Sequence, residues 1–142
     1  SVRVLIGEAF GQTSPVATYS RTLYLDVQLP AGATLEIPAL VPELAVYTVD
    51  APVSLNGGEV PTHILAVVEP VQPLHLTAGE TPVRLMVIGG EPLDAPRHMW
   101  WNFVSSRKER IVQAASDWEA QAMGQVPGEV EWIPLPEHRF KA

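Results

Sequence analysis

The sequence predicts a mainly β fold, an antiparallel β-sandwich or barrel followed by one C-terminal α-helix. Short apolar strands recur about every 8 to 12 residues with turn signals between them. The 14 prolines and 10 glycines among 142 residues favour many turns over a helical bundle. Helical periodicity begins only after Pro96. We expect a single domain over residues 1–142, because a chain of this length can bury one sizeable core.

The stretch RTLYLDVQLP gives the clearest strand signal. Its apolar side chains alternate with Thr, Tyr, Asp and Gln, which is the period of a half-buried strand. The tripeptide PAG at residues 30–32 then predicts a turn, and Asn56-Gly57 predicts a tight hairpin turn, because both residues tolerate a positive φ. The runs HILAVVEP, PLHLTA and VRLMVIGG continue the series. Strands are therefore expected over about residues 2–95.

A different pattern follows the connector expected over about residues 96–105. Ser106 and Glu109 have the spacing of a capping box, which predicts a helix over about residues 107–123, with Gly124 as its stop. One face of this helix carries its apolar residues, namely Ile111, Ala114, Ala115, Trp118 and Ala122. Trp118 is interpreted as a core residue that joins helix to sheet. In the tail, residues 124–142, the run GEVEWIPLP could return as an edge segment, although its prolines limit ladder hydrogen bonds.

Charge and composition exclude several function classes. The formal net charge of −7 opposes binding to nucleic acid, which requires clustered Lys and Arg. No apolar run is long enough to span a membrane, and the N-terminus lacks the features of a secretory signal. The absence of cysteine excludes thiolate nucleophiles and Cys-based zinc sites, and it fits a reducing compartment. We expect a cytoplasmic protein that has neither nucleic acid nor membrane as a partner.

Motifs for catalysis or cofactor binding are missing. Gly57-Gly58 and Gly89-Gly90 lack the lysine of a phosphate-binding loop, so turns are the expected role of both pairs. Ser105 and Ser106 are better explained by helix capping than by nucleophilic chemistry. The glutamates are dispersed and suggest no acid–base pair. No catalytic or cofactor-binding residue and no cofactor is predicted.

Several segments in a fixed order carry a family resemblance. They are VRVLIGEAFGQTSPV, LYLDVQLPAG, VYTVDAPVSLNGGEV, the run from VRLMVIGGEPLDAP to WNFVSSRKERIVQAASDW, and the ending WIPLP. Together they resemble the C-terminal half of pirin-like proteins, which belong to the cupin superfamily. The resemblance implies a jelly-roll β-sandwich with a C-terminal helix. It also implies that the metal of the family's quercetin-dioxygenase-like activity belongs to the other, N-terminal half.

The histidines decide whether this chain could hold a metal of its own. A metal-binding cupin presents a His-x-His pair, a nearby Glu and a further His, because a divalent metal needs several convergent ligands. His63, His75, His98 and His138 are isolated in the sequence, so no family ligand can be assigned. His63 and His75 are the candidates with some chance of facing the sandwich interior. Hydrogen-bonded structural roles are the preferred interpretation for both.

Aromatic residues suggest an interface. Trp100 and Trp101 are neighbours, so in an extended chain their side chains point in opposite directions and cannot both enter one core. The candidates for a docking surface are Trp100, Trp101, Phe103, Trp132 and Ile133.

Three functions stay open. The favoured one is a non-catalytic cupin half that docks onto another cupin half or onto a second copy of itself, as a homodimer. The alternatives are a metal-dependent quercetin 2,3-dioxygenase-like enzyme and a metal-free module that binds an unknown small molecule at the mouth of the sandwich.

Overall fold

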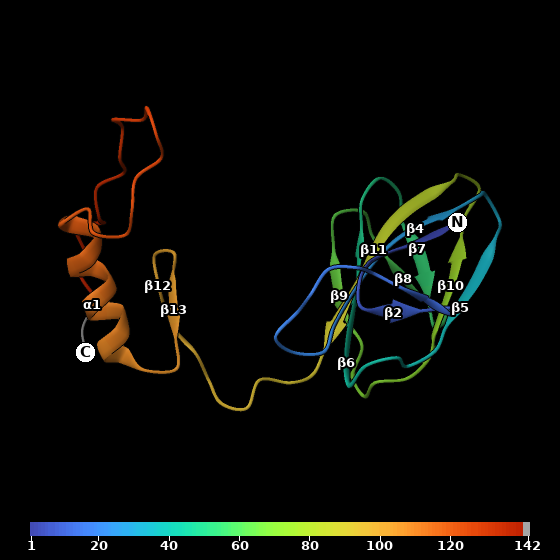
Figure 1. Cartoon of the computed structure of the whole chain (residues 1–142). Helices are drawn as coiled ribbons and strands as arrows, with labels where there is room; N and C mark the ends of the chain where they lie inside the picture. Colours follow the sequence, from blue (N-terminus) through green and yellow to red (C-terminus); the bar gives the residue numbers. More distant parts are fainter. Residues whose placement is uncertain (141–142) are drawn as a thin grey trace. The chain divides into compact units, whose positions relative to one another are not determined.

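The computed structural model describes residues 1–140 and confirms a mainly antiparallel β fold with a single C-terminal helix (Figure 1). Within the length expected as one domain, the chain divides into two compact units, Ser1–Pro92 and the part from Leu93 onward. Within residues 1–140, no helix is long and apolar enough to cross a membrane.

Two sheets form the first unit. The five-stranded sheet has the order β1-β4-β11-β6-β9, and the four-stranded sheet has the order β5-β10-β7-β8. The first sheet consists of β1 (Val2–Ile6), β4 (Thr22–Leu29), β6 (Glu43–Thr48), β9 (Leu65–Val67) and β11 (Val83–Gly90). The second consists of β5 (Thr34–Ile37), β7 (Val53–Leu55), β8 (Gly58–Val60) and β10 (Leu74–Ala78), and a short hairpin pairs β2 (Glu8–Ala9) with β3 (Gln12–Thr13).

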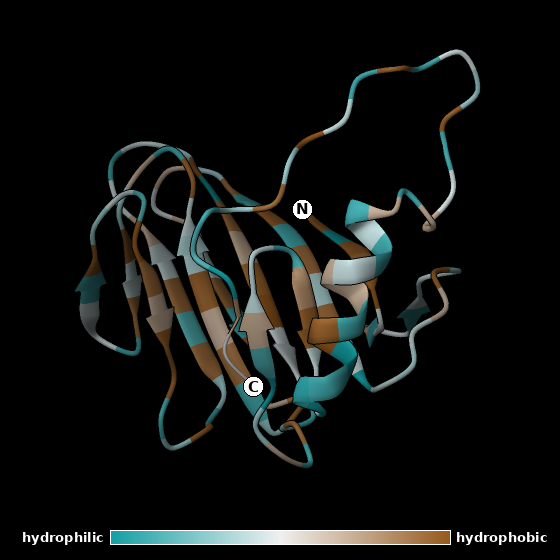
Figure 2. Ribbon diagram, turned by 90° about the vertical axis from the view of Figure 1, so that its left-hand side faces the viewer, coloured by the Kyte–Doolittle hydropathy of each residue, from teal (hydrophilic) through white to brown (hydrophobic). Residues whose placement is uncertain are grey.

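Alternation along the strands builds the core, as predicted. The apolar positions of β4, which are Leu23, Leu25, Val27 and Leu29, are all buried. Figure 2 shows the same alternation of hydrophobic and hydrophilic residues along the strands of this unit. The hairpin turn predicted at Asn56-Gly57 is confirmed, because this pair joins β7 to β8 with φ values of 50° and 85°. Gly89 and Gly90, by contrast, lie inside β11, so the turn predicted for this pair is wrong.

The second unit contains a hairpin where the sequence suggested a connector. The strands β12 (His98–Trp100) and β13 (Phe103–Ser105) pair with each other. Trp101 occupies the turn between them with a φ of 53°. Because bulky residues rarely adopt a positive φ, sequence patterns give no signal for this turn. The residues predicted as a connector therefore form a β-hairpin.

The helix α1 (Lys108–Glu119) is shorter than predicted, and the capping box is wrong. Arg107 is the residue that precedes the first turn, and its side chain makes no capping hydrogen bond. Ser105 ends β13, and its hydroxyl accepts a hydrogen bond from the backbone N–H of Arg107 (3.1 Å). Ser105, and not the predicted Ser106, therefore contacts the backbone at the helix start. The helix also ends before Gly124, because Gln121 already has a φ of 52°. No strand forms within residues 124–140, so the expected edge segment is absent from that stretch.

Candidate functional site

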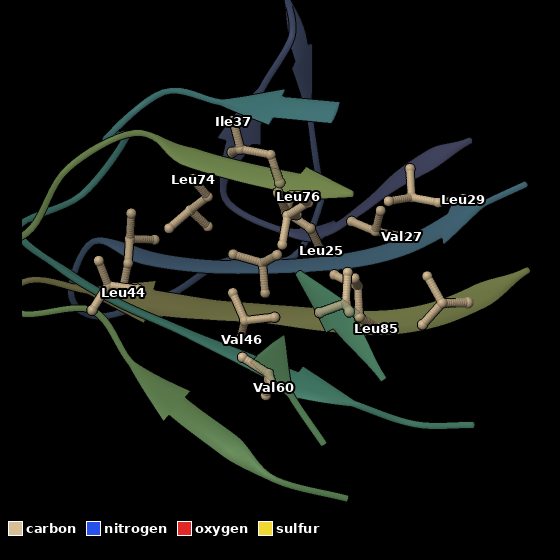
Figure 3. Close-up of a cluster of buried hydrophobic side chains, with 14 of the residues drawn as sticks. Leu25, Val27, Leu29, Ile37, Leu44, Val46, Val60, Leu74, Leu76 and Leu85 are labelled. Atoms are coloured by element: carbon tan, nitrogen blue, oxygen red, sulfur yellow. The ribbon is translucent and has the colours of Figure 1, made fainter. Parts of the chain in front are cut away.

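The interior of the β-sandwich is the first candidate for a site in a cupin-like fold. Aliphatic side chains from both sheets fill it, and Figure 3 shows them pointing into the space between the strands. Thr48 is the buried polar residue that shares this interior, within residues 1–140. Its hydroxyl donates a hydrogen bond to the carbonyl oxygen of Pro61 (2.6 Å), so its polar group is satisfied within the fold.

The two histidine candidates do not face this interior. His75 lies at an outward position of β10, and its Nδ1 is 3.6 Å from a carboxylate oxygen of Glu36. His63 is exposed in the loop before β9, where its backbone N–H donates to the carbonyl oxygen of Thr48 (2.9 Å). The expectation that either histidine could face the sandwich interior is therefore wrong. Within the described residues 1–140, no group of three His, Cys, Asp or Glu residues could hold a metal ion.

An open cleft of about 620 Å³ lies beside the β2–β3 hairpin of the first unit. Its buried lining includes Ala9, Leu23 and Val41, and the half-exposed Phe10 and Val16 also line it. The polar residues of its lining are Glu8, Thr13, Ser14, Thr18, Arg21 and Thr22. The Arg21 guanidinium already donates to the carbonyl oxygen of Leu40 (2.6 Å). The cleft can therefore offer an apolar surface and hydroxyl groups to a small molecule.

The aromatic residues of the β12–β13 hairpin and of α1 form a cluster inside the second unit. The ring centroids of Trp101 and Phe103 are 5.4 Å apart, and those of Trp101 and Trp118 are 5.1 Å apart. Both pairs have edge-to-face geometry. Trp100 also contacts this cluster, with its ring 6.4 Å from that of Trp101. Both tryptophans are partly buried in this cluster, and the expected opposite orientation does not apply, because Trp101 lies in a turn and not in extended chain.

The other two interface candidates, Trp132 and Ile133, are more exposed than the residues of the aromatic cluster. Trp132 is 47% exposed and Ile133 is 66% exposed. Both line a hollow of about 570 Å³, together with Trp118 and residues of the loop after the helix. The indole N–H of Trp118 donates to the carbonyl oxygen of Ile133 (2.7 Å), which ties this part of the tail to the helix. Trp118 is thus partly buried against Trp101 and the tail.

Sequence reasoning missed an apolar surface on the five-stranded sheet. The strand register aligns Tyr24, Ile88, Ala45 and Val67 in one row across the sheet. The next row in the same direction contains Met86, Tyr47 and Leu65, with Asp26 beside them. Because alternate residues of a strand point to opposite faces, these side chains all lie on the face that points away from the core. We call the seven apolar residues Tyr24, Ala45, Tyr47, Leu65, Val67, Met86 and Ile88 the outer sheet face.

The outward face of the four-stranded sheet has the opposite character. Its register places polar side chains in neighbouring positions, namely Thr34, Glu36, Ser54, Glu59, His75 and Thr77. Polar residues are what an antiparallel sheet presents to water. The two sheets therefore differ in what their outward faces can contact.

A charge pair is built into the outer sheet face. Asp26 is only 6% exposed, and it accepts two hydrogen bonds from the guanidinium of Arg84, at 2.9 and 3.0 Å. These hydrogen bonds hold the pKa of the Asp26 carboxyl below its ordinary value, although burial acts in the opposite direction. The carboxylate is thus neutralised locally and needs no charge from a ligand or partner.

We expect the Arg84→Met variant to unfold at a lower urea concentration at neutral pH, because the buried carboxylate of Asp26 loses its partner. A carboxyl whose pKa is lowered by folding stabilises the protein above its unfolded pKa of about 3.9, and that contribution is lost as the pH falls through the folded pKa. The difference between wild type and variant should therefore shrink in acid. Urea titrations at neutral and acidic pH measure this.

The control for this prediction is Glu91→Gln, which removes the exposed ion pair between Glu91 and Arg21 (3.7 Å). Exposed pairs contribute little to stability. An equal loss in Glu91→Gln, or a difference for Arg84→Met that does not depend on pH, would contradict the role given to Asp26.

Comparison with known proteins places the chain in a family. The sequence profile of the Pirin C-terminal cupin domain matches residues 24–124. A pirin-like protein of Caulobacter vibrioides is 42% identical over 137 residues, which are 95% of this chain and 46% of that protein. A pirin-like protein of Solanum lycopersicum is 31% identical over 126 residues, covering 84% of this chain and 43% of that protein.

A solved structure agrees with the fold. The crystal structure of a quercetin 2,3-dioxygenase from Acinetobacter baumannii matches with a TM-score of 0.86 and 25% identity, over 99% of this chain and 48% of that one. The chain thus spans less than half the length of each of these relatives. The predicted cupin fold is confirmed. The chain belongs to the pirin family, and the part of that family it matches is the C-terminal cupin domain.

Proposed function

We propose that this chain acts as a structural and docking half of a pirin-like protein, without a catalytic or metal centre of its own. The observation that carries the proposal is the sandwich interior, which aliphatic side chains fill, while His63 and His75 are exposed outside it. Its partner would be another cupin half or a second copy of the chain. The lack of cysteine supports the cytoplasm as its compartment.

The second candidate is the enzyme, a quercetin 2,3-dioxygenase-like protein. The Acinetobacter baumannii structure carries that name and shares the fold. Against it, a bound divalent metal needs several ligands that converge with an open position, and the exposed His63 and His75 lie on different elements. A third candidate, a module that binds a small molecule without metal, is favoured by the open cleft beside the β2–β3 hairpin.

We expect protein that is purified without added metal to contain far less than one iron, copper, nickel or zinc ion per chain, and to turn over no quercetin. Elemental analysis and an oxygen-uptake assay measure the two quantities. The matched variants are His63→Ala and His75→Ala. Near-stoichiometric metal and turnover that both disappear in either variant would replace the docking proposal with the enzyme.

A small molecule that stays bound during purification would distinguish the third candidate, the metal-free binding module, from the other two. Native mass spectrometry of the purified chain would detect a ligand held in the cleft as a discrete mass increment. Phe10→Ala removes an aromatic ring from the cleft lining without touching the core. An increment that is present in the wild type and absent in Phe10→Ala would support the binding module.

A further inference from the structure

The turn between β7 and β8 places a side-chain amide next to an accessible backbone nitrogen. Asn56 and Gly57 form a two-residue loop, and the pair Leu55–Gly58 closes the ladder beside it. Both loop residues have a positive φ, of 50° and 85°, and both are exposed. Water and hydroxide therefore reach the Asn56 amide and the Gly57 nitrogen in the folded protein.

Strand pairing leaves the backbone N–H of Gly57 available. In an antiparallel hairpin the residues of the closing pair exchange the ladder hydrogen bonds. That pair is Leu55 and Gly58, so the loop residue Gly57 lies outside the ladder. A Cβ at Gly57 would meet nothing within 4 Å, so no neighbouring segment crowds this side of the turn. The nitrogen that follows Asn56 is thus neither used by the ladder nor shielded by a side chain.

A backbone donor points at the side-chain oxygen of Asn56. The N–H of His75 donates to Oδ1 of Asn56 (2.7 Å), and the N–H of Asn56 donates to the carbonyl oxygen of His75 (2.9 Å). These two hydrogen bonds continue the pairing of β7 with β10 into the turn. When a nucleophile attacks the amide carbon, negative charge develops on Oδ1, and a donor already in place stabilises that charge. The His75 N–H is therefore positioned as an oxyanion donor for attack at Cγ of Asn56.

We infer that Asn56 is a site of spontaneous deamidation in the folded protein. The Gly57 nitrogen forms a bond to Cγ of Asn56, and its proton leaves with the side-chain amide as ammonia, which gives a cyclic succinimide. Water then opens the ring. Hydrolysis of the new bond leaves aspartate, whereas hydrolysis of the original peptide bond leaves isoaspartate, with the main chain running through the side-chain carbon. The net reaction consumes one water, releases one ammonia and oxidises nothing.

The two products affect the sheet differently. Aspartate keeps an oxygen for the His75 N–H and adds one negative charge to a chain whose net charge is −7. Isoaspartate lengthens the main chain by one carbon inside a turn whose geometry matches the twist of the flanking strands. The edge strand β8 is held by β7. Isoaspartate should therefore loosen β8 and uncover Val60, which is only 7% exposed.

Asn102 is the other asparagine of the chain and serves as an internal control. It is also exposed and lies in a hairpin turn, between β12 and β13. The residue that follows it is Phe103, which belongs to the closing pair Trp100–Phe103. The nitrogen after Asn102 thus lies in the ladder and beside a bulky side chain, so Asn102 should react more slowly than Asn56.

Peptide mapping of the folded protein during storage at neutral pH tests the inference. Cleavage after glutamate releases residues 44–59 and 81–109, each of which contains one asparagine and no glutamine. Deamidation raises the mass of a peptide by nearly the mass of one hydrogen atom, and an isoaspartyl methyltransferase detects isoaspartate. Residue 56 should convert at least about tenfold faster than residue 102, a difference of about 1.4 kcal/mol in activation free energy.

Asn56→Gly is the matched variant, because glycine tolerates a positive φ in this turn but has no side chain to cyclise. It should show no mass change in residues 44–59 and the wild-type conversion of residue 102. Asn56→Asp supplies the aspartate product from the start. The urea midpoint should fall in stored wild type and not in freshly prepared Asn56→Asp. An equal fall in that variant would contradict the loosening of β8 by isoaspartate.

Two results would overturn the inference. One is conversion of residue 56 no faster than that of residue 102 in the folded protein. The other is conversion of residue 56 more than about tenfold slower in folded protein than in protein unfolded by guanidinium chloride, because the native turn would then protect Asn56. Neither result bears on the proposed docking function, which metal content and quercetin turnover test separately.

Discussion

Replacing Leu85 with alanine should lower the free energy of unfolding of the first unit by about 2 to 5 kcal/mol. Leu85 is 0% exposed and lies at the middle of β11, between β4 and β6. Its side chain points into the space between the two sheets, so the truncation leaves a cavity that neighbours fixed in strands can fill only in part (Figure 3). The same packing is the observation on which the proposed function rests. Urea denaturation followed by far-UV circular dichroism gives the loss.

Ile64→Ala is the control for Leu85→Ala. Ile64 precedes β9 and is 47% exposed, so its truncation removes less buried surface and opens no enclosed cavity. Its effect should be clearly smaller. If both variants lost the same amount, the interior would not be close-packed, and room for a ligand between the sheets would have to be reconsidered.

Gly89→Ala should destabilise the first unit by about 1 to 3 kcal/mol, although it adds only one methyl group. A Cβ at this position would lie 2.3 Å from the carbonyl oxygen of Glu43, 2.7 Å from Cγ2 of Val41 and 2.9 Å from Cδ2 of Leu44. The backbone cannot simply move away, because β11 is paired on both sides at this residue. The thermal and urea midpoints should both fall.

Gly79→Ala provides a matched control for this substitution. It adds the same methyl group at a glycine where nothing lies within 4 Å of the new Cβ and the φ is not positive. It should be neutral or slightly stabilising, because alanine restricts the unfolded chain. If Gly79→Ala were as destabilising as Gly89→Ala, loss of glycine flexibility and not steric overlap would explain the result.

Local sequence patterns predicted the elements whose conformation depends mainly on residues close in the chain. The alternation along residues 22–29 requires only the two-residue period of a strand, and the turn at Asn56-Gly57 requires only tolerance of a positive φ. Both predictions are confirmed. The amphipathic helix was also predicted, with Ile111 on its buried face, although its bounds were wrong by a few residues. Caps depend on where the preceding strand ends, which periodicity does not reveal.

Features that depend on distant residues were not predictable in this way. The outer sheet face exists because β11 pairs with β4 on one side and β6 on the other, which aligns Tyr24, Ile88 and Ala45 across segments far apart in the chain. The β12–β13 hairpin was missed because its turn uses Trp101, a residue that seldom adopts a left-handed backbone. Gly89 was interpreted as a turn residue because only the folded sheet shows what its missing side chain avoids.

The placement of the aromatic residues has an optical consequence. All four tryptophans belong to the second unit, and all three tyrosines, Tyr19, Tyr24 and Tyr47, belong to the first. Tryptophan fluorescence therefore reports the second unit alone, including its tail, whereas tyrosine emission reports the first unit. Coincident melting curves from these probes would mean that both units unfold together. The efficiency of energy transfer from tyrosine to tryptophan would then report the distance between the two units without any added label.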